Sequence, residues 1–199
     1  MTNSNNREGV DKLPVDYLGF ILYPKSKRYA PGGNDPGLFH TFKSKVGVYV
    51  NEGLYEIIES ARQYGFEFVQ LHGSESSSTC RILKRYRLKV IKVFNLDESF
   101  YFESLKDYKD TVDYFLFDTK TRVPGGSGKK FNWDILERYK GDVPFFLSGG
   151  IQPGDAQAIK NLHHPALYGV DLNSGFEDKP GIKNIEKLEK FINELRNNV

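Results

Sequence analysis

The chain has 199 residues, with 28 lysines and arginines against 26 aspartates and glutamates, so its net charge is close to neutral. The charges are scattered, which gives no electrostatic case for a nucleic-acid or anionic-membrane partner. A single cysteine, Cys80, excludes an internal disulfide framework and fits a reducing cytoplasm. No apolar stretch approaches the ~20 residues that span a bilayer, and the polar N-terminus carries no signal-peptide core. We therefore expect a soluble, cytoplasmic protein with one domain over residues 1–199.

Short apolar runs alternate with longer amphipathic stretches from Asp16 onward. After a helix-sized segment at roughly Asn5–Leu13, the pattern predicts strands at Tyr17–Tyr23, Val46–Val50, Phe68–His72, Val90–Leu96, Tyr114–Asp118, Phe145–Ser148 and Leu167–Leu172. Helices are predicted at Gly53–Tyr64, Ser76–Tyr86, Ser99–Tyr108, Trp133–Tyr139, Asp155–Asn161 and Ile185–Asn197. Alternation of this regularity predicts a parallel sheet with helical crossovers.

The predicted strands are one fewer than a closed (β/α)8 TIM barrel needs, and such barrels typically need ~250 residues, with ~200 near the lower limit. An open doubly wound sheet is the competing fold, and it usually places its phosphate loop after the first strand. Here the glycine-rich loops follow the last three strands, as in a barrel that binds phosphate near its final strands. We therefore favour the α/β barrel, with the missing strand being the first, ahead of Tyr17.

The stretch from Val112 to Trp133 contains the strongest candidate for a catalytic acid. The apolar run Tyr114–Phe117 is typical of a strand buried on both faces, and it ends in Asp118, ahead of a glycine loop. An N-cap or a salt-bridge partner is the structural alternative for this carboxyl group. An acid at a strand tip of a parallel β/α fold instead favours an active site, where desolvation raises a carboxyl pKa toward use as a general acid.

Three glycine-containing loops are the candidates for a phosphate site, because glycines let backbone N–H groups approach an anion. The predicted phosphate-binding residues are Gly126, Ser127, Gly149, Gly150, Asn173, Ser174 and Gly175. Ordinary β-to-α turns are the alternative reading. Glycine loops after three consecutive strands favour the anion site.

Two further strand ends carry candidates for substrate binding. Arg28 follows the first predicted strand, and its planar guanidinium can hold a carboxylate with two hydrogen bonds. The neighbouring Lys25 and Lys27 are expected to be solvated loop charges. His72 ends the third predicted strand, where a hydrogen-bonded structural role competes with a role in substrate contact.

The remaining chemical side chains have simpler expectations. Lys92, inside an apolar strand, is either an inward charge at the rim or a salt-bridge partner. Cys80 lies near a helix start and is expected to pack as a small apolar residue. The other histidines, His40, His163 and His164, show no metal-ligand spacing, and we expect no metal site.

Specific sequence blocks run in order along the whole chain. They are GFILYPKSKRY (19–29), VGVYVN (46–51), VQLHG (69–73), DTKT (118–121), GGSGKKFNW (125–133), LSGGIQP (147–153), VDLNSGFE (170–177) and PGIK (180–183). Together these blocks resemble phosphoribosylanthranilate isomerase, the (β/α)8 barrel of tryptophan and hence aromatic amino-acid biosynthesis. Several ordered blocks in one chain are a far stronger signal than a lone glycine motif.

The resemblance implies an Amadori rearrangement of N-(5-phosphoribosyl)anthranilate, a phosphorylated small molecule, without metal or organic cofactor. It implies that Asp118 protonates the ribose ring oxygen and that Arg28 faces the anthranilate portion. His72 and Asp171 are counted with Arg28 as substrate-binding residues, and the loops at Gly149–Gly150 and 173–175 correspond to the phosphate site, helped by Gly125–Gly128.

One departure from the family pattern affects the expected chemistry. In the family the first strand ends in Cys-Gly, and that cysteine removes the C2 proton, whereas this chain starts at Met1, just after that point. We therefore expect the first strand and the general base to be missing, and Cys80, at a helical position, not to replace it. Two functions stay open: the isomerase, and an inactive truncated barrel that binds a sugar phosphate or a partner chain. The short chain is expected either to be poorly stable or to self-associate through the open barrel edge. A third function, indole-glycerol-phosphate synthase, is disfavoured by the blocks at 118–133 and 19–29.

Overall fold

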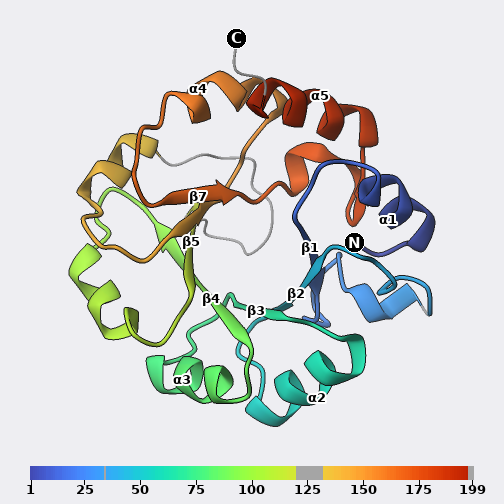
Figure 1. Cartoon of the computed structure of the whole chain (residues 1–199), viewed down its shortest axis with the longest axis horizontal. Helices are drawn as coiled ribbons and strands as arrows, with labels where there is room; N and C mark the ends of the chain where they lie inside the picture. The colour runs from blue at the N-terminus through green and yellow to red at the C-terminus, as the bar shows by residue number, and fades with distance from the viewer. Residues whose placement is uncertain (34, 120–131, 197–199) are drawn as a thin grey trace.

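The main sheet of the protein has seven parallel strands, in the spatial order β1-β2-β3-β4-β5-β6-β7, so each strand lies beside its sequence neighbour. The structure is a computed structural model that describes residues 1–33, 35–119 and 132–196. The sheet curls around a central axis, and the helices lie outside it (Figure 1). This arrangement confirms the predicted α/β barrel class with seven strands.

Each predicted strand is present, with ends within two residues of the prediction. The strands are β1 (Tyr17–Ile21), β2 (Ser44–Tyr49), β3 (Phe68–Leu71), β4 (Lys89–Leu96), β5 (Tyr114–Thr119), β6 (Phe145–Leu147) and β7 (Leu167–Val170). The α-helices are α1 (Ser4–Asp11), α2 (Leu54–Tyr64), α3 (Ser77–Arg85), α4 (Ala156–Lys160) and α5 (Ile185–Arg196). Short 3-10 helices are η1 (Ala30–Gly33), η2 (Phe102–Tyr108), η3 (Trp133–Arg138), η4 (Pro153–Asp155) and η5 (Ser174–Phe176). No helix among these is long and apolar enough to cross a bilayer.

Two of the predicted helices have a different helix type in the structure. The segments Ser99–Tyr108 and Trp133–Tyr139 form the 3-10 helices η2 and η3 rather than α-helices. Both are short, and η2 is rich in aromatic and small polar residues with modest helix propensity. The ring of Phe102 packs against those of Phe100 and Phe117, so tertiary contacts fix this segment more than helical hydrogen bonds do.

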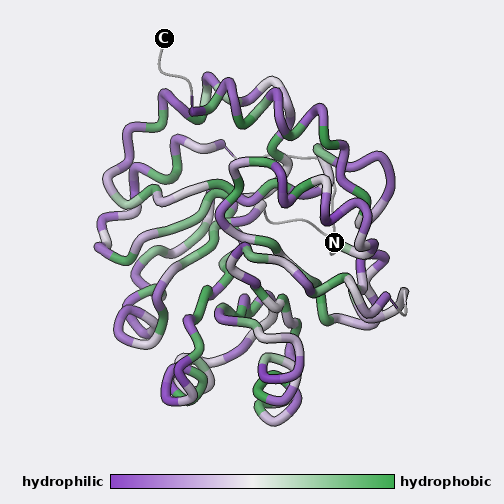
Figure 2. Tube along the Cα trace, turned by 45° about the vertical axis from the view of Figure 1, so that its right-hand side comes forward, coloured by the Kyte–Doolittle hydropathy of each residue, from purple (hydrophilic) through white to green (hydrophobic). Residues whose placement is uncertain are grey.

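Alternate strand residues build two separate cores, because side chains of a strand point to opposite faces. The inside of the barrel is filled by Val46, Val48, Phe68, Ile91, Val93, Leu116 and Phe146. The larger core lies between the sheet and the helices, and Val90, Phe115 and Phe117 belong to it. Figure 2 shows hydrophobic colour concentrated along the central strands, with alternating colours on the surrounding helices. The two cores hold the strand ends in place for the site described below.

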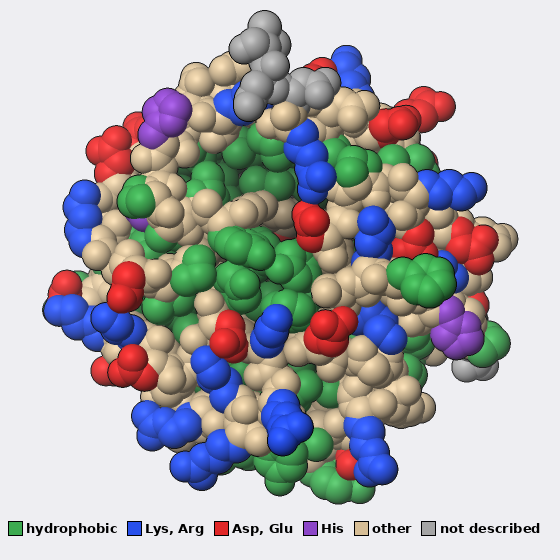
Figure 3. Space-filling view, in the orientation of Figure 1, with side chains coloured by type: hydrophobic (Ala, Val, Ile, Leu, Met, Phe, Trp, Pro, Cys, Tyr) green, Lys and Arg blue, Asp and Glu red, His purple; other side chains and the backbone are tan. Residues whose placement is uncertain are grey.

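The sheet is not closed by backbone pairing in the described residues, since β1 pairs only with β2 and β7 only with β6. The side chains of Tyr17 and Tyr168 bridge the two edges with a hydroxyl–hydroxyl hydrogen bond of 3.1 Å. Further along β1, the amino group of Met1 donates to the carbonyl oxygen of Gly19 at 3.2 Å. On the face drawn in Figure 3, hydrophobic side chains gather at the centre and in a hollow next to α5. That the gap belongs to a further strand stays a prediction.

Candidate active site

A cavity of about 1240 Å³ opens inside the curled sheet and extends along the gap between β1 and β7. At the carboxyl ends of the strands it is lined by polar residues: Arg28, His72, Asp118, Ser148, Gly149, Gly150, Asp171, Asn173, Ser174 and Lys183. Because parallel strands end at the same edge of a sheet, loops far apart in sequence meet here. The structure thus places most of the predicted site residues around one cavity.

Asp118 and His72 face each other at the tips of β5 and β3. The carboxylate Oδ2 of Asp118 lies 3.3 Å from Nε2 of His72, and both side chains are partly buried. The other oxygen, Oδ1, accepts a hydrogen bond of 2.7 Å from the backbone N–H of Thr119. These two contacts fix the orientation of the carboxyl group while leaving it open to the cavity.

Gly149 shows why the loop after β6 needs a glycine at its second position. Its φ of +89° lies in the left-handed region that favours glycine. A Cβ at this position would lie 2.4 Å from the backbone nitrogen of Thr119 and 2.7 Å from Oδ1 of Asp118. The missing side chain therefore allows the β6 loop to pack directly against the acid.

The two predicted phosphate loops touch each other. A Cβ on Gly175 would lie 2.3 Å from the carbonyl oxygen of Ile151, so the loop after β7 lies against the loop after β6. The backbone N–H groups of Gly150, Ser174 and Gly175 donate to no described residue. Free backbone donors in glycine-rich turns are the usual elements of an anion site. The remaining predicted phosphate ligands, Gly126 and Ser127, lie outside the described residues.

Asp171, just beyond β7, is the second carboxyl group at this end of the cavity. Burial raises its pKa above the ordinary value, and the nearby Asp118 acts in the same direction, while Lys183 opposes both. The hydroxyl of Ser148, which follows β6, donates to Asp171 Oδ2 at 3.3 Å. The end of the cavity at the strand tips therefore holds two carboxyl groups in different surroundings, which is a common arrangement in acid–base sites.

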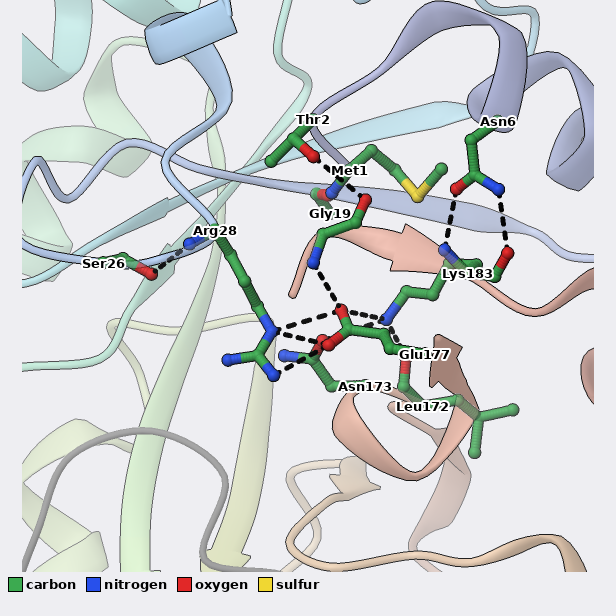
Figure 4. Close-up of polar contacts among 11 residues, drawn as sticks. Met1, Thr2, Asn6, Gly19, Ser26, Arg28, Leu172, Asn173, Glu177 and Lys183 are labelled. Atoms are coloured by element: carbon green, nitrogen blue, oxygen red, sulfur yellow. Dashed lines mark hydrogen bonds and ion pairs between the residues drawn. The ribbon is translucent and has the colours of Figure 1, made fainter. Parts of the chain in front are cut away.

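Arg28 is paired with a residue that the sequence analysis did not single out. Its Nη2 lies 2.7 Å from Glu177 Oε2, and its Nε donates to the same oxygen at 2.8 Å (Figure 4). Lys183 Nζ contacts the other oxygen of Glu177 at 3.2 Å and donates to Asn173 Oδ1 at 2.9 Å. Burial opposes the ionisation of Glu177, but Arg28 and Lys183 outweigh it and hold its pKa below the ordinary value. Burial in turn lowers the pKa of Lys183.

Glu177 and Lys183 belong to a hairpin of β8 (Glu177–Lys179) and β9 (Ile182–Lys183) that the sequence analysis did not predict. Gly181 in its turn has a φ of +84° and follows Pro180, which fits a type II turn. The Pro-Gly pair between two short charged runs is the sequence feature from which this hairpin could have been predicted. Glu177 closes the block at 170–177, but nothing in the sequence links it to Arg28.

Three other predicted side chains are placed clearly. Lys92 is a salt-bridge partner, as one of the two alternatives predicted, with Glu75 at 3.0 Å. Cys80 is fully buried in α3, which confirms its packing role, and burial raises its pKa to about 11. Lys25 and Lys27 are exposed loop residues at the mouth of the cavity.

Comparisons with known proteins agree on one family. A family model described as N-(5'phosphoribosyl)anthranilate (PRA) isomerase matches residues 2–194. The N-(5'-phosphoribosyl)anthranilate isomerase of Parabacteroides distasonis is 43% identical over 199 residues, covering 98% of this chain and 90% of that protein. The crystal structure of phosphoribosyl anthranilate isomerase from Thermotoga maritima has a TM-score of 0.84 at 32% identity, covering 98% of this chain and 95% of that one. Another solved phosphoribosyl anthranilate isomerase, in complex with reduced 1-(o-carboxyphenylamino)-1-deoxyribulose 5-phosphate, has a TM-score of 0.82 at 29% identity, with the same coverage.

Proposed function

This chain belongs to the N-(5'-phosphoribosyl)anthranilate isomerase family of tryptophan biosynthesis, and we propose that its reaction runs in the cavity with Asp118 as the general acid. The observation that carries this assignment is the position of Asp118 at a strand tip, 3.3 Å from His72 and packed against Gly149. The substrate is N-(5-phosphoribosyl)anthranilate, and the product is 1-(2-carboxyphenylamino)-1-deoxyribulose 5-phosphate.

The chemistry begins with proton transfer from Asp118. Its carboxyl group donates a proton to the ribose ring oxygen while the bond from that oxygen to C1 breaks, which leaves a Schiff base with the anthranilate nitrogen. Loss of the C2 proton converts the protonated Schiff base to an enaminol, and protonation at C1 with loss of the C2 hydroxyl proton then gives the ketone product. His72 contacts the carboxyl group and holds it toward the substrate. A positioned acid or base of this kind typically contributes ~10²–10⁴-fold in rate.

The phosphate group of the substrate is proposed to bind between the loops after β6 and β7. Backbone N–H groups of Gly150, Ser174 and Gly175 that have no described acceptor support this position. The side-chain Oδ1 of Asn173 accepts from Lys183, which leaves its amide Nδ2 as a donor for the phosphate. Gly126 and Ser127, which the sequence predicts as phosphate ligands and which lie outside the described residues, are proposed to complete the site.

The anthranilate carboxylate is proposed to bind Arg28. A guanidinium group has five N–H donors, and Glu177 takes those on Nε and Nη2. The donors on Nη1 contact no described acceptor and are free for a second carboxylate. An ammonium group has three donors, and Lys183 uses all of them on Leu172, Asn173 and Glu177. Lys183 therefore holds Glu177, and Glu177 orients Arg28.

Binding of a sugar phosphate without turnover is the second candidate function. The family resemblance implies a cysteine as the base for the C2 proton, and the sequence contains one cysteine, Cys80. That thiol is buried in α3, with its pKa raised to about 11 by burial, and does not line the cavity. An assay of binding and turnover separates the two functions.

We also propose that the chain associates with a second copy of itself through the gap between β1 and β7. Unpaired strand edges are templates for pairing with another chain, and Val170, Leu172 and Leu195 line the gap with partly exposed apolar side chains. Analytical ultracentrifugation over a range of concentrations tests this. A charge placed at the edge by Val170→Lys is expected to weaken the association, and a monomer at every concentration would contradict it.

Turnover of N-(5-phosphoribosyl)anthranilate by the purified chain and its Asp118→Asn variant tests the assignment of the acid. We expect kcat to fall ~10²–10⁴-fold in the variant, with the unfolding temperature unchanged. Asp142→Asn, which alters an exposed carboxylate, serves as the control. Near-wild-type kinetics in Asp118→Asn would remove this residue from the mechanism, and a folded wild type that binds but does not convert substrate would support the second candidate.

A further inference from the structure

We propose that the buried ion pair of Glu75 and Lys92 positions His72, and through it Asp118, for the proposed reaction. The pair lies on the outer side of the sheet, away from the cavity, and no role assigned above uses it. The inference rests on the proposed roles of His72 and Asp118. It makes Glu75 and Lys92 positioning residues that do not touch the substrate.

The burial of this pair is unusual for charged side chains. Glu75 Oε2 and Lys92 Nζ are 3.0 Å apart, and each side chain is only 3% exposed. Ile91 and Val93 point into the barrel, so Lys92 between them points outward, beneath the helices. Burying two charges costs desolvation free energy that their attraction repays only in part, so such a pair is weak evidence for stability. A role in fixing local geometry is the better explanation.

Lys92 binds the backbone on both sides of His72. Its Nζ donates to the carbonyl oxygen of Leu71 at 3.2 Å and to that of Gly73 at 2.7 Å. The third donor of the ammonium group goes to Glu75 at 3.0 Å. Since an ammonium group has three donors, Lys92 is saturated, and two of its three bonds hold the residues that flank His72.

Glu75 ties the same loop to the end of β2. Its carboxylate accepts from the backbone N–H of Gly73 at 3.0 Å and from that of Asn51 at 2.8 Å. Asn51 has a φ of +52°, and its Oδ1 accepts from the N–H of Ser74 at 2.7 Å. A Cβ on Gly73 would lie 2.3 Å from that Oδ1, so the two loops are in direct contact. The carboxylate of Glu75 is the common acceptor that holds them together.

These contacts fix the backbone that carries the imidazole of His72. The backbone N–H of His72 donates to the carbonyl oxygen of Tyr49 at 2.8 Å, and Nε2 lies 3.3 Å from Asp118. The ion pair therefore lies on the outer side of the sheet and the imidazole of His72 on the cavity side, and a short stretch of backbone connects them. A misplacement of about 1 Å in a reacting group can cost ~10²-fold in rate, so releasing this loop should lower kcat.

The test compares Glu75→Gln and the double variant Glu75→Gln/Lys92→Met with the wild type. Glu75→Gln keeps the shape of the side chain but removes its charge, which leaves Lys92 buried without a charged partner. The double variant removes both charges, so it can be used if the single variant does not fold. We expect kcat to fall about 10–100-fold while KM changes less than about 3-fold, because the substrate contacts are intact. The matched control is Lys84→Met/Asp113→Asn, which removes another ion pair, of 2.9 Å, that does not contact the His72 loop. Its kcat should stay within about 2-fold of the wild type.

A double-mutant cycle distinguishes positioning from general damage. In a His72→Gln background, adding Glu75→Gln should lower kcat by less than about 2-fold, because the residue it positions is gone. An equal loss with and without His72 would overturn the proposal, as would wild-type kcat in the folded Glu75→Gln/Lys92→Met variant.

A readout that needs no turnover separates this proposal from the proposed function. The side-chain nitrogen signals of His72 in an NMR spectrum should change in Glu75→Gln and stay unchanged in the Lys84→Met/Asp113→Asn control. If the wild type shows no turnover, the proposed function fails, and the NMR comparison still decides whether the ion pair sets the position of His72. Unchanged His72 signals in both variants would overturn the proposal.

Discussion

Two buried clusters of charge lie at the carboxyl ends of the strands, on opposite faces of the same sheet. Glu75 and Lys92 sit behind the sheet, each 3% exposed. Arg28, Glu177 and Lys183 sit on the cavity side, and the side chain of Arg28 is 15% exposed. All three N–H donors of Lys92 form hydrogen bonds within the protein. The donors on Nη1 of Arg28, in contrast, contact no described acceptor.

Burial and ion pairing alone therefore do not identify a charged group that binds a ligand. Both clusters contain a cation paired with a glutamate at 3.0 Å or less. The number of donors left over is what separates a group that can bind a ligand from one that holds the backbone. Substitutions on the cavity side should therefore affect the reaction directly. Substitutions on the outer side of the sheet should affect it only by moving His72, or not at all.

Gly149→Ala should have the largest effect among these changes, because it pushes a methyl group into the acid. The new Cβ would lie 2.7 Å from Asp118 Oδ1, at a φ of +89°. We expect kcat to fall about 100-fold and the free energy of unfolding to drop by about 1–3 kcal/mol. Steady-state kinetics and chemical denaturation measure both. Gly154→Ala is the control, since no atom lies within 4 Å of its added Cβ, and equal effects in the two variants would refute the explanation.

Arg28→Met should weaken substrate binding with less effect on the chemical step. A hydrogen bond to a charged group is worth about 1.5–3 kcal/mol, so KM should rise at least about tenfold while kcat changes less than about 3-fold. Lys27→Met removes an exposed cation from the same loop and should leave KM unchanged. If both variants raised KM alike, the loop would act through its general charge and not through Arg28.

Asp171→Asn should change the pH dependence of stability. Burial raises the pKa of Asp171 from 3.8 in the folded chain, so the folded state resists ionisation more than the unfolded state does. The contribution of Asp171 to wild-type stability should therefore fall as the pH rises from about 3.8 through the folded-state pKa, and stay lower above it. Asp171→Asn has no ionisable group at this position, so its free energy of unfolding should not fall for this reason as the pH rises. We expect the two Tm values to coincide near pH 4 and the variant to have the higher Tm at pH 8.

A calorimetric series from pH 4 to pH 8 measures this difference. A variant that is less stable than the wild type at pH 8 would show that Asp171 is stabilised as a carboxylate, against the direction given by its burial.

Cys80→Ala should have the smallest effect, because this thiol lies behind the sheet and outside the cavity. The loss of one buried sulfur should cost about 1 kcal/mol of stability and leave kcat within about 2-fold. Thermal unfolding and kinetics of the variant check both numbers. A large loss of kcat at unchanged stability would assign Cys80 a chemical role after all.

The sequence alone was enough for the strands and for the residues at their tips. Each strand is a short apolar run, and the polar residue that ends it, such as His72 or Asp118, must lie at the rim of a parallel sheet. The placement follows from the direction of the strands and needs no knowledge of distant contacts. Helix type was harder to predict, because η2 is held by aromatic packing that comes from other parts of the chain.

The pairing of charges could not be predicted, because it depends on distance in space. Arg28 and Glu177 are 149 positions apart, and no local pattern links them. Lys92 inside an apolar strand did indicate a partner, yet Glu75 could be identified only after the loop beyond β3 was placed against β4.

A crystal structure of this chain with reduced 1-(o-carboxyphenylamino)-1-deoxyribulose 5-phosphate, the compound bound in one solved relative, tests the central claim most directly. The account predicts the phosphate between the loops of Gly150 and Ser174–Gly175, the aromatic carboxylate within hydrogen-bond distance of Arg28, and the reduced sugar beside Asp118. A phosphate bound at Lys25 and Lys27, with Asp118 facing empty solvent, would contradict it.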